Sequence, residues 1–212
     1  MRTDDLVHAL AADCCAAQSS IGRQFALAIA VGFVISAVAF WVTLGFRPDI
    51  ATAVFTVRFD LKIVQALLLA TTAAALVLRL VRPGAGTRLR VAVMAATPIL
   101  LVIAVVAELV LVPADRWRAT LVGSNSFVCL TAIPLLSLPL LAALLLALRH
   151  GAPTRLGLAG AMAGLVAGGL AASLYATQCT DDSPLFVATW YSIAIGVVTV
   201  FGAVLGRYLL RW

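Results

Sequence analysis

The chain has 212 residues, of which 63% are apolar and only 11% are charged. Soluble domains carry about a quarter charged residues, so this composition excludes a water-exposed globular fold and predicts a protein embedded in a lipid bilayer. The net charge of +6 does not indicate a nucleic-acid binder, because the basic residues are scattered between apolar runs and form no single basic stripe.

Six runs of the sequence are long and apolar enough to cross a membrane as helices, each of which needs about 20 residues. The predicted spans cover approximately residues 24–46, 61–81, 91–112, 126–148, 156–177 and 185–206. Residues 1–23 precede them as a tail that is too short to form a domain. We therefore predict an all-α polytopic membrane protein, a bundle of six transmembrane helices with short loops.

The second predicted span is the weakest, because it is free of charged residues only between positions 63 and 78. Lys62 and Arg79 flank this stretch. Their long side chains are expected to snorkel to opposite interfaces, which lengthens the span, so we keep it as a transmembrane helix.

Basic residues are divided unequally between the two sides of this bundle. Ten of the 15 fall in the tail, the second loop, the fourth loop and the C-terminus, and five fall on the other side. Short cytoplasmic loops carry the excess of Lys and Arg, so both termini are predicted to be cytoplasmic.

The fifth predicted span carries a glycine at every fourth position, which places these glycines on one helix face. The ridge predicts close packing against another helix and not a substrate path, because no polar group accompanies it. The three glycines are Gly160, Gly164 and Gly168. In the fourth span, Pro134 and Pro139 are expected to produce static kinks.

The spans lack the residues that haem, ion or catalytic sites require. The two histidines, His8 and His150, lie in the tail and in a cytoplasmic loop, so neither is placed to bind haem inside the bundle. Glu108 is the one acidic residue inside a span, and we expect it to pair with an arginine, Arg116 or Arg118, rather than to bind an ion. Walker, GxSxG, HExxH and CxxC patterns are absent, so the sequence predicts neither an enzyme nor a cofactor.

Two cysteines fall on the predicted outer side. Cys129 begins the fourth span and Cys179 lies in the loop between the fifth and sixth spans. One interpretation is a disulfide that closes a loop of about 50 residues and contributes about 3–4 kcal/mol on the chain-entropy model. The other is a sensor in which an accessible pair reacts with an oxidant or a thiophilic metal. The residues alone leave both interpretations open.

The surroundings of Cys179 bear on its chemistry. Asp181 and Asp182 follow it, and their negative charges are expected to disfavour the thiolate. A tight structural zinc site needs four ligands, and no histidine is available on this side, so no permanent metal is predicted.

The tail has the pattern of a short amphipathic helix. Thr3 can cap it, Asp4 and Asp5 occupy its first turn, and the apolar stripe consists of Leu6, Val7, Leu10, Cys14 and Ala17. Its acidic character makes it a poor match for an anionic membrane surface. We expect it to bind a groove of a soluble protein, the alternative being a disordered segment that leads into the first span. Cys14 and Cys15 are interpreted as small side chains of this helix, because cytoplasmic thiols stay reduced.

Several short motifs are spread along the chain. They are TDDL at 3–6, FRPD at 46–49, FVCL at 127–130, IPLL at 133–136, LPL at 138–140, GAPT at 151–154, DDSPLF at 181–186 and WY at 190–191. Each is weak alone, but together they resemble the NrsF family, named for negative regulator of sigma F. The resemblance covers essentially the whole chain.

The resemblance implies a six-span anti-sigma factor of the bacterial inner membrane. The cytoplasmic tail would sequester an extracytoplasmic-function sigma factor through Asp4, Asp5, Leu6, Val7 and Leu10. The two outer cysteines of the family match Cys129 and Cys179 and would take part in sensing. Gln178 stands where some members have histidine, which weakens the case for direct metal capture. No direct contact with nucleic acid is implied.

Two rival functions come from other classes. A membrane thiol oxidoreductase that exchanges electrons with quinone would require a reactive CxxC pair, which the sequence lacks. A small-solute transporter would require a polar cavity at the midplane, and the spans supply only scattered Ser and Thr for it.

Overall fold

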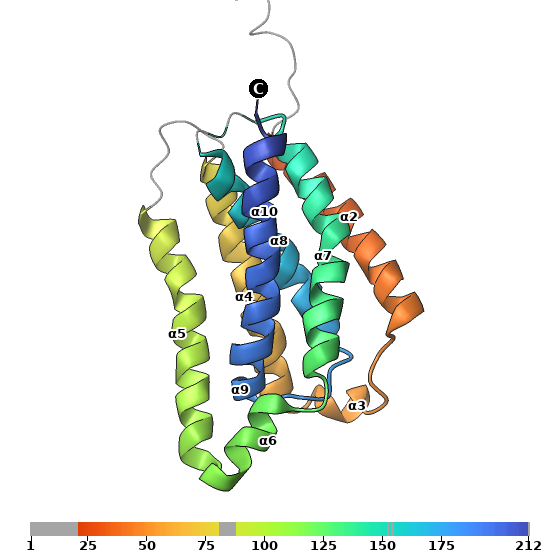
Figure 1. Cartoon of the computed structure of the whole chain (residues 1–212), viewed down its shortest axis with the longest axis vertical. Helices are drawn as coiled ribbons and strands as arrows, with labels where there is room; N and C mark the ends of the chain where they lie inside the picture. The colour runs from red at the N-terminus through yellow and green to blue at the C-terminus, as the bar shows by residue number, and fades with distance from the viewer. Residues whose placement is uncertain (1–20, 81–87, 152, 154, 212) are drawn as a thin grey trace, which may run out of the picture.

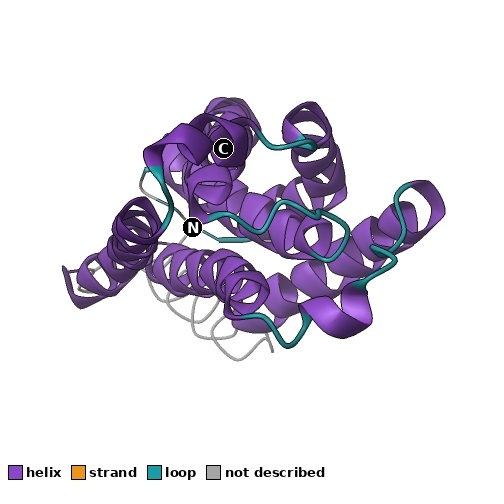
Figure 2. Cartoon of the chain, turned by 90° about the horizontal axis from the view of Figure 1, so that it is seen from below, coloured by secondary structure: helices purple, strands orange, loops and turns teal. Residues whose placement is uncertain are grey.

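The structure is a computed structural model that describes residues 21–80, 88–151, 153 and 155–211. The predicted tail residues Asp4, Asp5, Leu6, Val7 and Leu10, and the pair Cys14 and Cys15, lie outside the described residues. The described residues form helices and loops and no strand, which confirms the predicted all-α class (Figures 1 and 2).

Six helical segments are long and apolar enough to cross a membrane, as predicted. Short helical turns precede or interrupt several of them. In chain order the elements are α2 (Ile21–Thr43), α3 (Ile50–Ala53), α4 (Val57–Leu80), α5 (Arg88–Leu111), η1 (Ala114–Arg116), α6 (Trp117–Val122), α7 (Ser126–Leu148), α8 (Leu156–Ala176), α9 (Pro184–Phe186), the π-helical turn η2 (Val187–Tyr191) and α10 (Ser192–Leu209).

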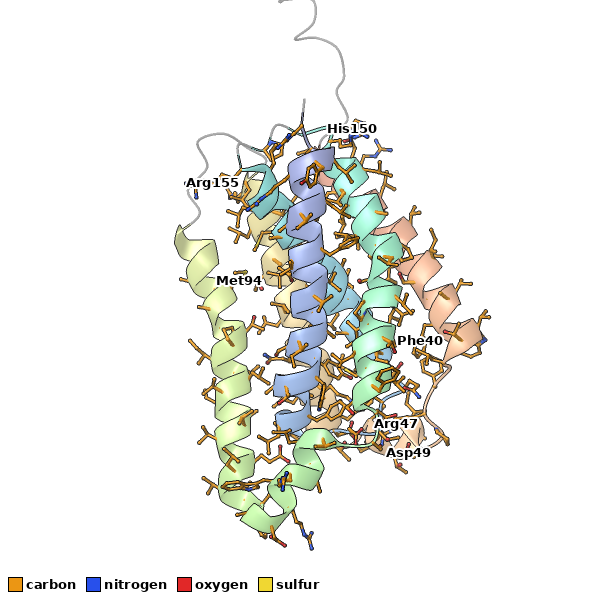
Figure 3. All side chains as sticks on the ribbon, in the orientation of Figure 1. Phe40, Arg47, Asp49, Met94, His150 and Arg155 are labelled. Atoms are coloured by element: carbon orange, nitrogen blue, oxygen red, sulfur yellow. The ribbon has the colours of Figure 1, made fainter. Side chains whose placement is uncertain are left out.

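The bundle has two different ends. The loops at 44–56, 112–125 and 177–183 gather at one end, which we call the cysteine end. The opposite end, which we call the arginine end, carries the turn at 149–155 and the C-terminal residues. In Figure 3 Arg47 and Asp49 lie at the cysteine end, and His150 and Arg155 lie at the arginine end. Which end faces the cytoplasm stays a prediction from the arginine distribution.

Helix α8 occupies the centre of the bundle because its residues are small. Most of its side chains are buried, and α4, α7 and α10 all pack on it. A Cβ atom on Gly160 would overlap Gly202 O and lie 2.8 Å from Gly206 Cα, and one on Gly164 would lie 2.7 Å from Val198 O. The glycine ridge therefore packs directly against the backbone of α10, which confirms the predicted packing role.

Helix α2 packs on α7 in a similarly close contact. A Cβ atom on Gly32 would lie 2.8 Å from Leu140 Cα. Next to it, Ser36 Oγ donates a 2.7 Å hydrogen bond to Leu136 O. The carbonyl that Pro139 leaves without a helical donor is that of Leu135, so the hydrogen bond from Ser36 to Leu136 lies one residue away from this weakened position. Helices α2 and α7 are thus joined by both packing and a buried hydrogen bond.

Candidate sensor site at the cysteine end

The two outer-side cysteines lie in the same buried cluster. Cys129 is in the first turn of α7, Cys179 follows α8, and both side chains are fully buried and unbridged. Tyr175 and Tyr191 belong to the same cluster, and their rings are 5.8 Å apart. The fold therefore brings together two cysteines that are 50 positions apart in the sequence.

Burial dominates the protonation of Cys179. It raises the pKa of this thiol above its ordinary value, because the thiolate would lose its hydration. Lys62 lowers the pKa, and Asp181 acts in both directions, because its backbone hydrogen bond lowers the pKa and the charge of its carboxylate raises it by less. The direction of the sequence prediction is confirmed, but its cause was wrong, because desolvation outweighs the neighbouring aspartates.

The loop that carries Cys179, residues 177–183, is the centre of a polar network. We call it the Cys179 loop. Its Asp182 accepts from two cations, Arg47 Nη1 at 2.8 Å and Lys62 Nζ at 2.5 Å. The same cations donate to Cys179 O, over 3.3 Å from Arg47 and 2.9 Å from Lys62. The backbone at Cys179 and the carboxylate of Asp182 are thereby fixed to α4 and to the segment after α2.

Lys62 does not snorkel to the interface, so that prediction was wrong. Its side chain is fully buried in α4, which begins at Val57 and not near residue 61. A buried ammonium group requires a counter-ion, and Asp182 supplies it. The ring of Phe59 lies beneath the pair of cations, with its centroid 5.5 Å from Lys62 Nζ and 5.9 Å from Arg47 Cζ.

Arg47 bridges two carboxylates. Besides Asp182, it forms a two-pronged ion pair with Asp49, in which both hydrogen bonds measure 2.7 Å. Hydrogen bonding to Arg47 lowers the pKa of Asp49 below its ordinary value, and hydrogen bonding to Asp49 contributes most to raising the pKa of Arg47. Arg47 thus stays charged while it holds the Cys179 loop to the loop that follows α2.

The other aspartate of the loop, Asp181, caps α7. Its Oδ2 accepts from the backbone N–H of Ser124 at 3.0 Å and of Asn125 at 2.8 Å, and from Asn125 Nδ2 at 2.9 Å. Negative charge at a helix N-terminus is stabilising, because free N–H groups and the helix dipole both point toward it. The cap of the helix that carries Cys129 therefore comes from the loop that carries Cys179.

Glu108 has other partners than those predicted. Its carboxylate is buried and accepts from Ser183 Oγ at 2.9 and 3.0 Å and from the backbone N–H of Leu185 at 3.2 Å. Its described ion pair is with Arg58, 3.8 Å away, and not with Arg116 or Arg118. The expectation of those two partners was wrong because η1 and α6 direct the segment after α5 into its own short helices. Glu108 instead fixes α5 to the start of the last span.

The Cys179 loop therefore connects to every span. It leads from α8 into α9 and α10 along the chain. Through side chains it binds Arg47 after α2, Lys62 of α4, Glu108 of α5 and the N-terminus of α7. A displacement of this loop has to be accommodated by contacts to α4, α5, α7 and the segment after α2, and by the chain on either side of the loop in α8 and α9.

The positions of the side chains that could act as metal ligands determine whether this site can hold a metal ion. Within the described part of the chain, no three His, Cys, Asp or Glu side chains lie close enough together to hold a metal ion. Asp181 and Asp182 are engaged by the α7 N-terminus and by Arg47 and Lys62.

Sequence reasoning missed Arg47 and Lys62 as members of this site. The signal was present, because FRPD at 46–49 and DDSPLF at 181–186 carry opposite charges in loops of the same predicted side. For Lys62 the sequence predicts an interfacial position, because its place at the end of an apolar run does not show whether its side chain is buried in the bundle.

Comparisons with known proteins agree on one family. The family model described as NrsF, negative regulator of sigma F, matches residues 10–212. The chain is 36% identical over 214 residues to a protein of Caulobacter vibrioides named anti-sigma-F factor NrsF, and 33% identical over 214 residues to one of Azospira oryzae named probable anti-sigma-F factor NrsF. Each alignment covers 100% of both chains. No solved structure matches the chain.

Proposed function

The chain belongs to the NrsF family of negative regulators of sigma F, and we propose from this that it holds an extracytoplasmic-function sigma factor at the bacterial inner membrane until a signal reaches Cys129 and Cys179. The family makes it an anti-sigma factor with a regulatory and not an enzymatic role. The type of sigma factor, the binding segment, the signal and the sidedness are parts of the proposal.

The tail binds the sigma factor in this proposal. Its apolar stripe of Leu6, Val7 and Leu10 is suited to a groove, and Asp4 and Asp5 stabilise the start of the helix. The family model begins at residue 10, whereas both relatives align along the whole chain, so the first residues are compared only through the relatives.

Oxidation is the form of signal that the site favours. Two thiols form an S–S bond and pass two electrons and two protons to an oxidant such as hydrogen peroxide, which leaves as two molecules of water. The neighbouring carboxylates are engaged in other contacts, which disfavours a stable metal complex. Because both thiols are fully buried, the oxidant reaches them only when the Cys179 loop opens.

The observation that carries the proposal is the position of the Cys179 loop, which contacts α4, α5, the N-terminus of α7 and the segment after α2, and which joins α8 to α9 and α10 along the chain. Bridging Cys129 to Cys179 draws this loop and the first turn of α7 together. Helix α2 is joined to α7 through Gly32 and Ser36, and the tail leads directly into α2. A shift of α7 therefore moves the anchor of the tail, and release follows if the two arrangements of the bundle differ in affinity for the sigma factor.

The role of the tail is tested by co-purification with the cognate sigma factor. Deletion of residues 1–18, or the double substitution Leu6→Asp and Leu10→Asp, should abolish binding, because the apolar stripe is lost. Gln18→Asp adds one negative charge on the polar face, without touching the apolar stripe, and should leave binding unchanged. Full binding by the deletion variant would exclude the tail as the binding segment.

The role of the thiols is tested by target-gene induction in cells. Cys129→Ser and Cys179→Ser should each abolish induction by peroxide, and a disulfide between the two should be detected by mass spectrometry of the induced wild type. Cys14→Ser with Cys15→Ser is the matched control and should respond normally. An unaltered response of the Cys129 and Cys179 variants would reduce the pair to a structural role.

Sidedness is tested independently with exposed positions, since the native thiols are buried. In a cysteine-free variant, Phe55→Cys at the cysteine end and His150→Cys at the arginine end each introduce an accessible thiol. A membrane-impermeant maleimide applied to spheroplasts should label position 55 and not position 150. The reverse pattern would place the tail outside the cell and overturn the proposal.

A further inference from the structure

A cavity lies between α4, α5 and α10, on the side of the bundle away from α2. Its volume is about 610 Å³, within the roughly 300–1,000 Å³ typical of small-molecule sites. Ser192 and Val200 of its wall are exposed, so it opens at the flank between α5 and α10 that faces lipid. Its walls are mainly apolar and include Ala66, Leu69, Met94, Leu101, Ile195 and Val200.

Three buried polar atoms without hydrogen-bond partners belong to residues of this cavity. They are Gln65 Oε1, Thr97 Oγ1 and Tyr191 Oη. The three residues are 6%, 3% and 2% exposed, in that order. A buried polar group without a partner is costly, so three around one cavity require an explanation. They come from three different helical segments, α4, α5 and η2, all of which contribute residues to the wall of this cavity.

Thr97 is an exception among the threonines of the described helices. The others donate to a carbonyl three or four residues earlier, as Thr199 does to Ile195 O at 2.8 Å from the wall of the same cavity. Thr71 and Thr72 of α4 form the same kind of bond. The hydroxyl of Thr97 forms none, and it is therefore available to a ligand.

The orientation of the Gln65 amide is fixed by its other end. Nε2 donates a 2.7 Å hydrogen bond to Thr97 O, a contact that only the NH₂ group can make. Oε1 is consequently the free end, and it can only accept. The ligand must therefore offer a donor to Gln65 and groups that donate or accept toward Thr97 and Tyr191.

We propose that this cavity binds a membrane quinol, an apolar ring that carries hydroxyl groups and enters from the lipid. Each quinol hydroxyl both donates and accepts, which matches one acceptor and two hydroxyls. Glycerol ester carbonyls of ordinary phospholipids only accept and leave Gln65 Oε1 unpaired. The inference is separate from the proposed function, because it involves neither the tail nor the sigma factor.

The π-helical turn η2 supports this site. Val187 and Tyr191 both line the cavity and occupy the two ends of the turn. Such turns are frequent at functional sites, because the extra residue redirects side chains. Tyr191 also belongs to the cluster that contains Cys129 and Cys179, so this residue is shared by the cavity wall and the thiol cluster.

The test is direct binding to the full-length protein in lipid nanodiscs that lack quinones. The ligand is a tritiated decyl-substituted benzoquinol, kept reduced with excess reductant. Its binding is measured by scintillation proximity, alone and in competition with unlabelled decylquinol or with decylbenzene. Saturable binding that decylquinol displaces and decylbenzene does not is the expected result. Absence of saturable binding, or equal competition by decylbenzene, would overturn the proposal.

Two variants connect the binding to the free polar atoms. Thr97→Val and Tyr191→Phe keep the shape of the side chain and remove an unpartnered hydroxyl, so each should weaken quinol binding about fivefold to tenfold without lowering the unfolding temperature. Thr199→Val, from the same cavity but with its hydroxyl already bonded, is the matched control and should bind normally. Unchanged affinity of the first two variants would show that the hydroxyls do not contact a ligand, and the assignment of the site would be wrong.

Discussion

The two ends of the bundle are held together by different forces. The ion pairs that the structure describes are at the cysteine end, where Asp182 alone joins Arg47 and Lys62. At the arginine end the helices instead approach through glycines, with Gly160 against Gly202 and Gly206. The exposed arginines Arg149, Arg155, Arg207 and Arg211 belong to the turn and the C-terminal residues at this end, where Figure 3 labels Arg155.

The difference shows how a small membrane protein separates two tasks. Buried charges are satisfied only in specific geometries, so the cysteine end specifies one arrangement of its loops. Glycine contacts depend on shape alone, so the helices at the arginine end approach closely without buried charge. The following predictions test this contrast, from the largest expected effect to the smallest.

The largest effect is expected from Asp182→Asn. The substitution keeps the shape but leaves Lys62 buried without its counter-ion, which costs about 3–5 kcal/mol of the free energy of unfolding. Circular dichroism during thermal unfolding in detergent measures the loss. Adding Lys62→Met should recover most of it, because an apolar residue then replaces the unpaired charge. Asp49→Asn, on an exposed partner of Arg47, is the control and should change stability far less.

A second large effect is expected at the arginine end from Gly160→Ala. Its Cβ would overlap backbone atoms of α10, which cannot be relieved by a side-chain rotation, so overpacking should cost about 2–3 kcal/mol. Gly196→Ala, which meets no atom within 4 Å, is the matched control and should be neutral or stabilising. Equal unfolding temperatures of the two variants would refute the assignment of glycine packing to this end.

A smaller effect is expected from Glu108→Ala. It leaves the hydroxyl of Ser183 and the backbone N–H of Leu185 without their acceptor, a loss of about 1–2 kcal/mol. Arg58→Ala removes the other partner but should cost little, because Arg58 is 53% exposed and 3.8 Å away. Thermal unfolding distinguishes them, and a larger effect at Arg58 would mean that the ion pair holds α5, and not the hydrogen bonds from Ser183 and Leu185.

The smallest expected effect is a decrease of the free energy of unfolding at alkaline pH. Burial raises the pKa of Cys179, while the thiol of the unfolded chain ionises near its ordinary value of about 8.5. Above that pH the unfolded chain binds fewer protons than the folded one, so the free energy of unfolding falls as pH rises. Under reducing conditions the wild type should lose more stability between about pH 7 and 9.5 than Cys179→Ser does. Equal losses would mean that this thiol is not desolvated in the folded state.

Much of the architecture was predictable because the relevant signals are local in sequence. Apolar length alone identified six spans, since a helix in lipid satisfies its own backbone. The four-residue spacing of Gly160, Gly164 and Gly168 placed them on one face, and the structure confirms their packing role. The positions of Cys129 and Cys179 next to helix ends likewise placed them at the same end of the bundle.

The tertiary structure decided which polar groups meet. Lys62 and Asp182 are 120 positions apart, and Glu108 and Ser183 are 75 apart, so no local pattern pairs them. A charged residue at the end of an apolar run can extend to the interface or turn inward, and the choice depends on whether the fold supplies a counter-ion. The sequence by itself determined the helices and their small-residue faces, because hydropathy and side-chain size act along each segment. The burial of Lys62, the cap on α7 and the meeting of the two thiols required the folded bundle, because each depends on distances between segments that only packing sets.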